Sequence, residues 1–197
     1  KDAFIVPSSV SKSQMNAGIA EAASMYISER LTENSFINMG YGDTPSRILN
    51  NLATMAERPI TCVSLTGGVS YYLPDTRSNV FNAKLHLIPT PLLASSKEMA
   101  AAMRQEDSVT EISRMISLAQ LTVVGIGAMH ETATIFKSGI LNRNDFLYLQ
   151  MQGAVGDLLS HFIDANGNLI ETPLEERLIS TSLPKIKALK WSRGQST

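Results

Sequence analysis

The sequence predicts an α/β fold of the Rossmann-like kind, in which helices cover both faces of a mostly parallel sheet. Short apolar runs alternate with amphipathic stretches along most of the 197-residue chain, as strands and helices do when right-handed crossovers connect parallel strands. The apolar runs are nearly continuous, which is typical of strands covered on both faces. Because no repeat, low-complexity tract or linker interrupts this pattern, we expect a single domain over residues 1–197.

The strands are expected at the short apolar runs. Near the C-terminal end, the dipeptide Asn166-Gly167 is typical of a hairpin turn and predicts a strand on each side of it. In chain order the expected strands cover residues 3–6, 35–40, 60–65, 84–89 and 121–129, followed by the hairpin over 161–171 and a strand over 178–183.

Two helices are predicted by apolar residues at helical spacing. The first covers about residues 14–31, and the second runs from Pro45 to about residue 55. The residues spaced for one face are Met15, Ile19, Ala22 and Tyr26 in the first helix, and those expected to turn inward in the second are Ile48, Leu49, Leu52 and Met55.

Two further helices are predicted by capping boxes, in which a serine precedes a glutamate by three residues. Ser95 with Glu98 starts a helix that ends near residue 105, and Ser108 with Glu111 starts another that ends near residue 119. The acidic pair at residues 106–107 then falls at a solvated helix junction, which explains it without a catalytic role.

Charge and cysteine content exclude several classes of function. Lys plus Arg number 17 against 18 for Asp plus Glu, a net charge of -1, so this chain alone lacks the basic excess that nucleic-acid binding needs. The single cysteine, Cys62, permits no internal disulfide and fits a reducing compartment. We interpret Cys62 as a buried strand residue rather than a nucleophile. No apolar run is long enough to span a membrane.

Glycine-containing stretches follow several of the predicted strands, where open α/β sheets bind ligands. They cover residues 40–44, 66–69, 125–129 and 153–157. In the first, "GYGDT", Thr44 is expected to cap the next helix and Pro45 to suit its first turn. The backbone N–H groups there form either a phosphate cradle or an ordinary strand-to-helix turn, and residue patterns alone leave both open. Because its carboxylate would repel a phosphate, Asp43 is aimed at a sugar hydroxyl.

The remaining polar candidates have simpler alternatives. Gly67 and Gly68 permit either close approach of a ligand or a tight turn, and Asp157 either accepts from a hydroxyl or caps a helix. Asp164 is a turn residue. The histidines share no metal-ligand spacing with a cysteine or an acid, and no nucleophile elbow or phosphate-binding lysine motif occurs. We therefore expect no catalytic residue and no metal site.

Taken together and in this order, the glycine stretches resemble the C-terminal effector-binding domain of the SorC family of bacterial transcriptional regulators. The matching pieces are "GYGDT", "VSLTGGV", "IPTPLLASS", "VVGIGAM" and "GAVGDLLSHFIDANGNLI". The last is the most specific, because a glycine-flanked segment followed by an aromatic-x-Asp hairpin is a hallmark of that family. The resemblance covers about residues 3–190 and is closest to regulators of sorbose-type sugar operons.

The resemblance implies a sugar-phosphate isomerase-like fold that acts as a cytoplasmic sensor, without a catalytic site or cofactor. Members bind phosphorylated sugars such as sorbose 1-phosphate, assemble as dimers or tetramers, and control operator DNA through an N-terminal helix-turn-helix domain that this chain lacks. Carried over by motif, the residues expected to line the phosphate or its neighbouring hydroxyls are Gly42, Asp43 and Thr44, those of the adjacent wall are Gly67 and Gly68, and the acceptor of sugar hydroxyls is Asp157.

The end of the chain departs from the family pattern after about residue 190. The family continues with a strand, an Ala-Gly-Gly turn and a lysine that commonly meets the phosphate, whereas this chain reads "WSRGQST". We therefore expect a truncated C-terminal end. One hypothesis is a frameshift near Trp191, which fails if no single-base change in the coding DNA restores a family-like continuation.

Two other classes of function stay open. A sugar-phosphate isomerase on the same kind of fold would need an acid and a base within reach of its substrate, for which only Asp43, Asp157 and Glu106 are available. Turnover of a sugar phosphate would identify it. A purely structural oligomerisation module would respond to no ligand.

Overall fold

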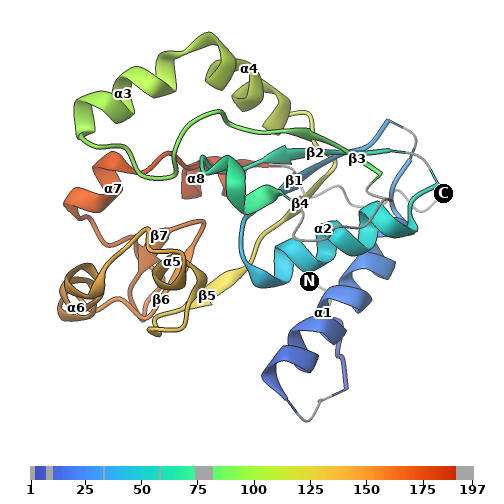
Figure 1. The fold of residues 1–197 in the computed structure, drawn as a ribbon, viewed down its shortest axis with the longest axis horizontal. Helices are drawn as coiled ribbons and strands as arrows, with labels where there is room; N and C mark the ends of the chain where they lie inside the picture. The colour runs from blue at the N-terminus through green and yellow to red at the C-terminus, as the bar shows by residue number, and fades with distance from the viewer. Residues whose placement is uncertain (1–2, 8–10, 33, 58, 74–81, 190–197) are drawn as a thin grey trace.

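A parallel sheet forms the centre of the molecule (Figure 1). The computed structural model describes residues 3–7, 11–32, 34–57, 59–73 and 82–189. The sheet has four parallel strands in the order β3-β2-β1-β4. The strands are β1 (Phe36–Met39), β2 (Ile60–Ser64), β3 (Ala83–His86) and β4 (Leu121–Val123).

Helices cover both faces of this sheet, as the sequence predicts. In Figure 1, α1 (Lys12–Ser28) and α2 (Asp43–Met55) lie below the sheet, and α3 (Lys97–Gln105) and α4 (Asp107–Ile116) lie above it. The chain runs outward from β1 to β3 and then returns over the other face to β4. The sheet therefore has a switch in strand order between β1 and β4, where ligands bind in open α/β folds.

Alternation along the strands supplies two hydrophobic cores. Cys62 packs with Ile37 and Met39 in the core between the sheet and α2, whereas the next residue, Val63, packs on the α4 side with Ile112. Burial raises the pKa of the Cys62 thiol to about 12. Cys62 is thus a buried strand residue, as expected.

A smaller antiparallel sheet stands beside the carboxyl ends of the parallel strands. Its order is β5-β6-β7, and in Figure 1 the short helices α5 and α6 lie against it. The strands of this small sheet are β5 (Ile126–Ala128), β6 (Gly156–Leu158) and β7 (His161–Ile163), and the two helices are α5 (Thr134–Lys137) and α6 (Arg143–Met151). After β7, the helices α7 (Pro173–Arg177) and α8 (Leu183–Ala188) flank the segment 178–182. The remaining element is the 3₁₀ helix η1 (Val69–Tyr72), which follows β2.

Three expected strands differ from the structure. Residues 3–6 form no strand, and Ile5 is 89% exposed. The expected strand over 121–129 divides at Gly125 into β4 and β5, which belong to different sheets. Residues 178–183 are extended, but Leu178 and Ser180 make only isolated bridges, because the segment crosses the strand ends instead of lengthening the sheet.

The Asn166-Gly167 turn is present, with Gly167 at φ +80, and Asp164 accepts from the N–H groups of Asn166 and Asn168, as a turn residue does. Only β7 precedes it as a strand, however. On the far side Leu169 makes a single bridge to Ile163.

The capping boxes predict the right helices with the wrong caps. Ser96, not Ser95, accepts from Met99 N and caps α3. Helix α4 begins at Asp107, so Ser108 lies inside it. The acidic pair at residues 106–107 is exposed at the junction between the two helices, as expected.

The apolar face predicted for α1 is wrong. Met15, Ile19 and Tyr26 are 42%, 40% and 40% exposed, while Ser24 and Ile27 are buried. Helix α1 turns the buried Ala20, Ser24 and Ile27 toward the core. The Ser24 hydroxyl donates to Ala20 O at 2.7 Å within the helix and lies 3.4 Å from Ile48 O of α2. In α2, the expected residues Ile48, Leu49 and Leu52 are buried, but Met55 at its end is 54% exposed.

The "WSRGQST" tail lies outside the described residues. Among the helices of the ranges given above, none is long and apolar enough to cross a membrane.

Two isoleucines of α1 test the packing of this helix. We expect Ile27→Ala to lower the free energy of unfolding by about 2–5 kcal/mol, because Ile27 is 6% exposed in the core. Ile19→Ala, on the exposed face, should change it by less than about 0.5 kcal/mol. Urea unfolding measures both. Equal losses would contradict the observed orientation of α1.

Candidate functional site

The "GYGDT" stretch forms the uncapped start of α2. Gly42 precedes the helix at φ +133, a conformation that favours glycine, and no side chain caps the helix. Thr44 is the second helical residue, so the expectation that Thr44 caps α2 is wrong. Pro45 has no N–H, and Ser46 N bonds to Gly42 O. The N–H groups of Asp43 and Thr44 thus begin a 13-residue helix without a side-chain acceptor, an arrangement that suits an anion.

The Asp43 carboxylate turns along its own helix. Arg47 Nε donates to both of its oxygens at 3.1 Å, and Asn16 Nδ2 donates at 2.8 Å. Partial burial acts to raise the pKa of Asp43, but the hydrogen bonds from Arg47 and Asn16 outweigh it and the pKa is lowered. Asp43 is therefore ionised, and Arg47 offsets the repulsion that a bare carboxylate would exert on a phosphate.

Gly67 and Gly68 lie where β2 ends, but their N–H groups are occupied. Gly67 N donates to Ile179 O at 2.9 Å, and Gly68 N donates to Thr90 O at 2.7 Å. A Cβ on Gly67 would lie 2.3 Å from Pro91 O, so close backbone packing requires glycine here. Gly68 has φ +84 before η1. The two residues form a wall beside the strand ends without offering N–H donors.

Asp157 braces the turn between β6 and β7. Its Oδ2 accepts from Ser160 N at 3.0 Å, so it caps a turn rather than a helix. Leu159 and Ser160 form this turn at φ +56 and +68, a conformation rare outside glycine. A Cβ on Gly127 would lie 2.0 Å from Asp157 Oδ1, so the strand beside it needs glycine. Burial raises the pKa of Asp157, against the opposing effects of the Ser160 N–H and of His161.

Tyr41 connects these pieces, and the sequence did not single it out. Its hydroxyl and Ser160 Oγ are 2.5 Å apart, and its ring centroid lies 5.7 Å from that of Tyr71 in η1. Burial, with a smaller effect from Asp157, raises its pKa, so the phenol stays neutral. An aromatic residue between two glycines at a strand end was the available signal.

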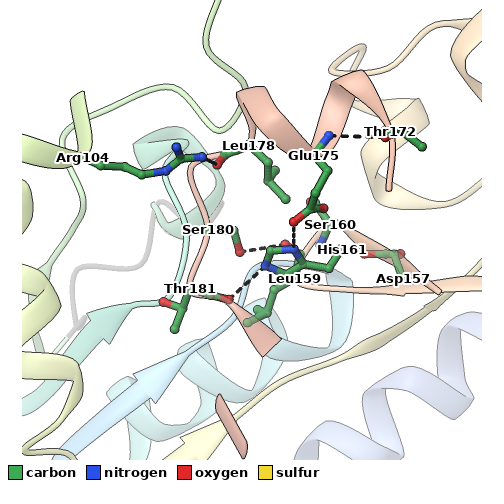
Figure 2. Close-up of polar contacts among 10 residues, drawn as sticks. All are labelled: Arg104, Asp157, Leu159, Ser160, His161, Thr172, Glu175, Leu178, Ser180 and Thr181. Carbon is green, nitrogen blue, oxygen red and sulfur yellow. Dashed lines mark hydrogen bonds and ion pairs between the residues drawn. The ribbon is translucent and has the colours of Figure 1, made fainter. Parts of the chain in front are cut away.

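A second polar group surrounds His161, the first residue of β7 (Figure 2). His161 is buried, with Nδ1 2.7 Å from Glu175 Oε1 and Nε2 3.0 Å from Thr181 O. Both ring nitrogens are thus engaged, as expected of a structural histidine. Within the described residues, no group of three His, Cys, Asp or Glu side chains is placed to hold a metal ion.

The six predicted site residues fall into three groups around Tyr41. Gly42, Asp43 and Thr44 start α2 beside Tyr41, and Asp157 braces the turn whose Ser160 contacts Tyr41. Gly67 and Gly68 precede Tyr71 on the other side. None of the six lines the cavity of about 360 Å³ that lies near His161 and α4. A ligand at the predicted site stays a prediction.

The Tyr41 hydroxyl tests the link between the two sheets. Tyr41→Phe keeps the ring but leaves Ser160 Oγ without this partner, so we expect a loss of about 0.5–1.5 kcal/mol in unfolding free energy. The matched control is Tyr71→Phe, because the Tyr71 hydroxyl makes no hydrogen bond within the described chain; its effect should stay within about 0.5 kcal/mol. Chemical denaturation distinguishes them, and similar losses would argue against the link.

Asp157 predicts a pH effect. Its folded-state pKa is raised above the ordinary value of 3.8, so the folded state favours the protonated acid. The resulting stability is fully present below the ordinary pKa and is lost as the pH rises through the raised one. Asp157→Asn keeps an acceptor for Ser160 N without the charge. Relative to wild type, the variant should therefore gain stability between about pH 4 and pH 7. Unfolding free energies at both pH values measure this, and a difference independent of pH would refute it.

Comparison with known families covers nearly the whole chain. Residues 1–192 match the family described as "Putative sugar-binding domain". The transcriptional regulator LsrR of Klebsiella pneumoniae is 29% identical over 179 residues, which is 89% of this chain and 55% of that protein. The chain spans about half the length of the curated relatives it matches. These relatives are named as regulators rather than enzymes, in agreement with the expectation that the chain is not an enzyme.

Solved structures show the same fold. The sugar-binding domain of a transcriptional repressor from Vibrio fischeri superposes with a TM-score of 0.79 at 19% identity, covering 94% of this chain and 76% of that one. The full-length sorbitol operon regulator SorC from Klebsiella pneumoniae gives 0.76 at 21% identity, covering 94% and 63%. The α/β fold and the family match agree with the resemblance found in the glycine stretches. The chain belongs to this family of sugar-binding domains, which occurs in SorC-like transcriptional regulators.

Proposed function

We propose that this chain is the effector-sensing domain of a bacterial carbohydrate-operon regulator and that it binds a phosphorylated sugar at the start of α2. The uncapped N-terminus of α2 carries the proposal. Asp43 N and Thr44 N have no side-chain acceptor there, and the positive end of the helix dipole favours an anion. Arg47 offsets the charge of the nearby Asp43 carboxylate.

The sugar hydroxyls are assigned to the groups around this start. The Thr44 hydroxyl adds a donor for the phosphate, and Asp43 has lone pairs beyond those that accept from Arg47 and Asn16. Asp157 lies across Tyr41 and Ser160 from α2 and is the acceptor on the other side. Gly67 and Gly68 supply the adjacent wall. Sorbose 1-phosphate is the first ligand to try, because of the sorbose-type resemblance.

The response is proposed to reach DNA through a second domain. The chain has a net charge of -1 and no overall excess of basic residues, and it spans about half the length of its relatives. We propose that an N-terminal helix-turn-helix domain binds the operator, that the regulator is cytoplasmic, and that it works as a dimer or tetramer. The exposed apolar face of α1 supports an oligomer.

Two threonines of α2 test the phosphate position. Thr44→Ala removes a donor at the start of the helix, and we expect sorbose 1-phosphate to bind on the order of 10-fold more weakly. Thr54→Ala is the matched control, because Thr54 is exposed near the far end of the helix. Among the described residues, its hydroxyl bonds to Asn50 O alone. Thermal unfolding follows binding, since a ligand at 100 times its dissociation constant adds about 2.7 kcal/mol of stability.

Three results would contradict the proposal. Equal affinity of the two threonine variants for sorbose 1-phosphate would show that the phosphate does not bind at the start of α2. Equal affinity of the protein for sorbose and for its phosphate would show that no anion site contributes to binding. Conversion of the sugar phosphate to a product would identify an isomerase instead of a sensor.

A further inference from the structure

A cavity of about 360 Å³ opens between α3, α4 and residues 178–185. Its volume is within the range of small-molecule sites. Figure 2 shows part of its lining, with Arg104, His161 and Glu175 around the extended segment that carries Thr181. We propose that this cavity is a second binding site, separate from the start of α2, for a small phosphorylated polyol.

Two cations from different helices line the cavity without a carboxylate partner. Arg104 Nη2 donates to Leu178 O at 2.7 Å, and Lys185 Nζ donates to Ser113 O at 3.0 Å. Each side chain uses one N–H donor for a backbone carbonyl. Because arginine has five N–H donors and lysine three, each has donors left for a ligand. In the part of the chain that the structure describes, neither lies within ion-pair distance of an acid. Both positive charges are therefore held in place and left for an anion.

The acid of the lining does not cancel these charges. Glu175 Oε1 lies 2.7 Å from His161 Nδ1, and Thr181 O lies 3.0 Å from Nε2. Glu175 is thus engaged by His161 and not by Arg104 or Lys185. The lining holds two cationic side chains against this one carboxylate, so the cavity has an excess of positive charge. This local charge is opposite in sign to that of the whole chain.

Hydroxyl groups beside the cations suit a polyol. The side chains of Ser113 and Ser182 line the cavity, and neither makes a hydrogen bond to any described residue. Each hydroxyl can donate and accept. Ile88, Val109 and Ile179 form an apolar floor. Two cations, two uncommitted hydroxyls and an apolar base match a phosphate group joined to a short hydroxylated carbon chain.

The cavity and the start of α2 can be separated by mutation. The segment 178–181 lines the cavity and is joined to the end of β2 by two backbone hydrogen bonds. In these bonds, Ile179 O accepts from Gly67 N and Leu65 O accepts from Thr181 N. The charged groups of the two places are different: Arg104 and Lys185 in the cavity, Asp43 and Arg47 at α2.

Two lysines of α8 provide the test. Lys185→Met keeps most of the aliphatic chain and removes the charge, whereas Lys187→Met removes an exposed charge from the same helix outside the cavity. Glycerol 3-phosphate is the probe, with glycerol and glycerate as the uncharged and carboxylate counterparts, and calorimetric titration gives the affinities. We expect the phosphate ester to bind best, Lys185→Met to weaken it on the order of 10-fold, and Lys187→Met and Thr44→Ala to leave it unchanged.

Several outcomes would overturn the site. They are no binding of glycerol 3-phosphate, equal binding of glycerol or glycerate, and equal losses in the two lysine variants. Weakening by Thr44→Ala but not by Lys185→Met would place the phosphate at α2, so that the proposed function stands and the cavity site fails. If Lys185→Met weakens the binding of glycerol 3-phosphate and Thr44→Ala weakens the binding of no sugar phosphate, the cavity site stands and the proposed function fails. If Lys185→Met does not fold, Arg104→Gln takes its place, with Arg114→Gln as its control on α4.

Discussion

The rest of the structure depends on the extended segment 178–181, which crosses the carboxyl ends of the strands. Gly67 N donates to Ile179 O, Ile179 N donates to Leu92 O, and Thr181 N donates to Leu65 O. The loops after β2 and β3 are thereby held to one piece of backbone. They also lie so close to each other that a Cβ at position 67 would lie 2.3 Å from Pro91 O. Two carbonyl groups of the same segment also contact side chains, because Leu178 O accepts from Arg104 and Thr181 O lies 3.0 Å from His161 Nε2. The segment therefore positions side chains of the cavity as well as the loops at the strand ends.

Glycines at the ends of the strands therefore have two different roles. At Gly67 and Gly127 the absence of Cβ lets backbone or a carboxylate pack closely, and the N–H of Gly67 is used within the protein. Gly42 occupies the N-cap position at positive φ, and because it has no side chain, the start of α2 is uncapped. Only the second arrangement leaves N–H groups for a ligand. Tyr41 then fixes the distance between this start and the turn of Asp157. A sensor needs such a rigid framework, because ligand binding affects the rest of the protein only if the residues around the ligand are held in place.

Sequence patterns predicted the sheet, both helical layers and the place of the glycine stretches, because burial on two faces leaves continuous apolar runs. They failed where tertiary packing decides. Met15, Ile19 and Tyr26 have helical spacing but face outward, since α1 packs through the smaller Ala20 and Ser24. Thr44 resembles a cap, yet Gly42 takes that position. The Tyr41–Ser160 contact and the cavity at Arg104 join residues far apart in sequence, and a single sequence does not show which distant residues meet.

The most direct test is a ¹⁵N–¹H spectrum of the chain titrated with sorbose 1-phosphate and, separately, with sorbose. The account predicts that the amide signals of Asp43 and Thr44 move with the phosphate only, because their N–H groups are the donors without a side-chain acceptor. Gly67 and Gly68, whose amides already bond to Ile179 and Thr90, should move much less. Saturable shifts elsewhere, with Asp43 and Thr44 unchanged, would contradict the claim that the start of α2 binds the effector.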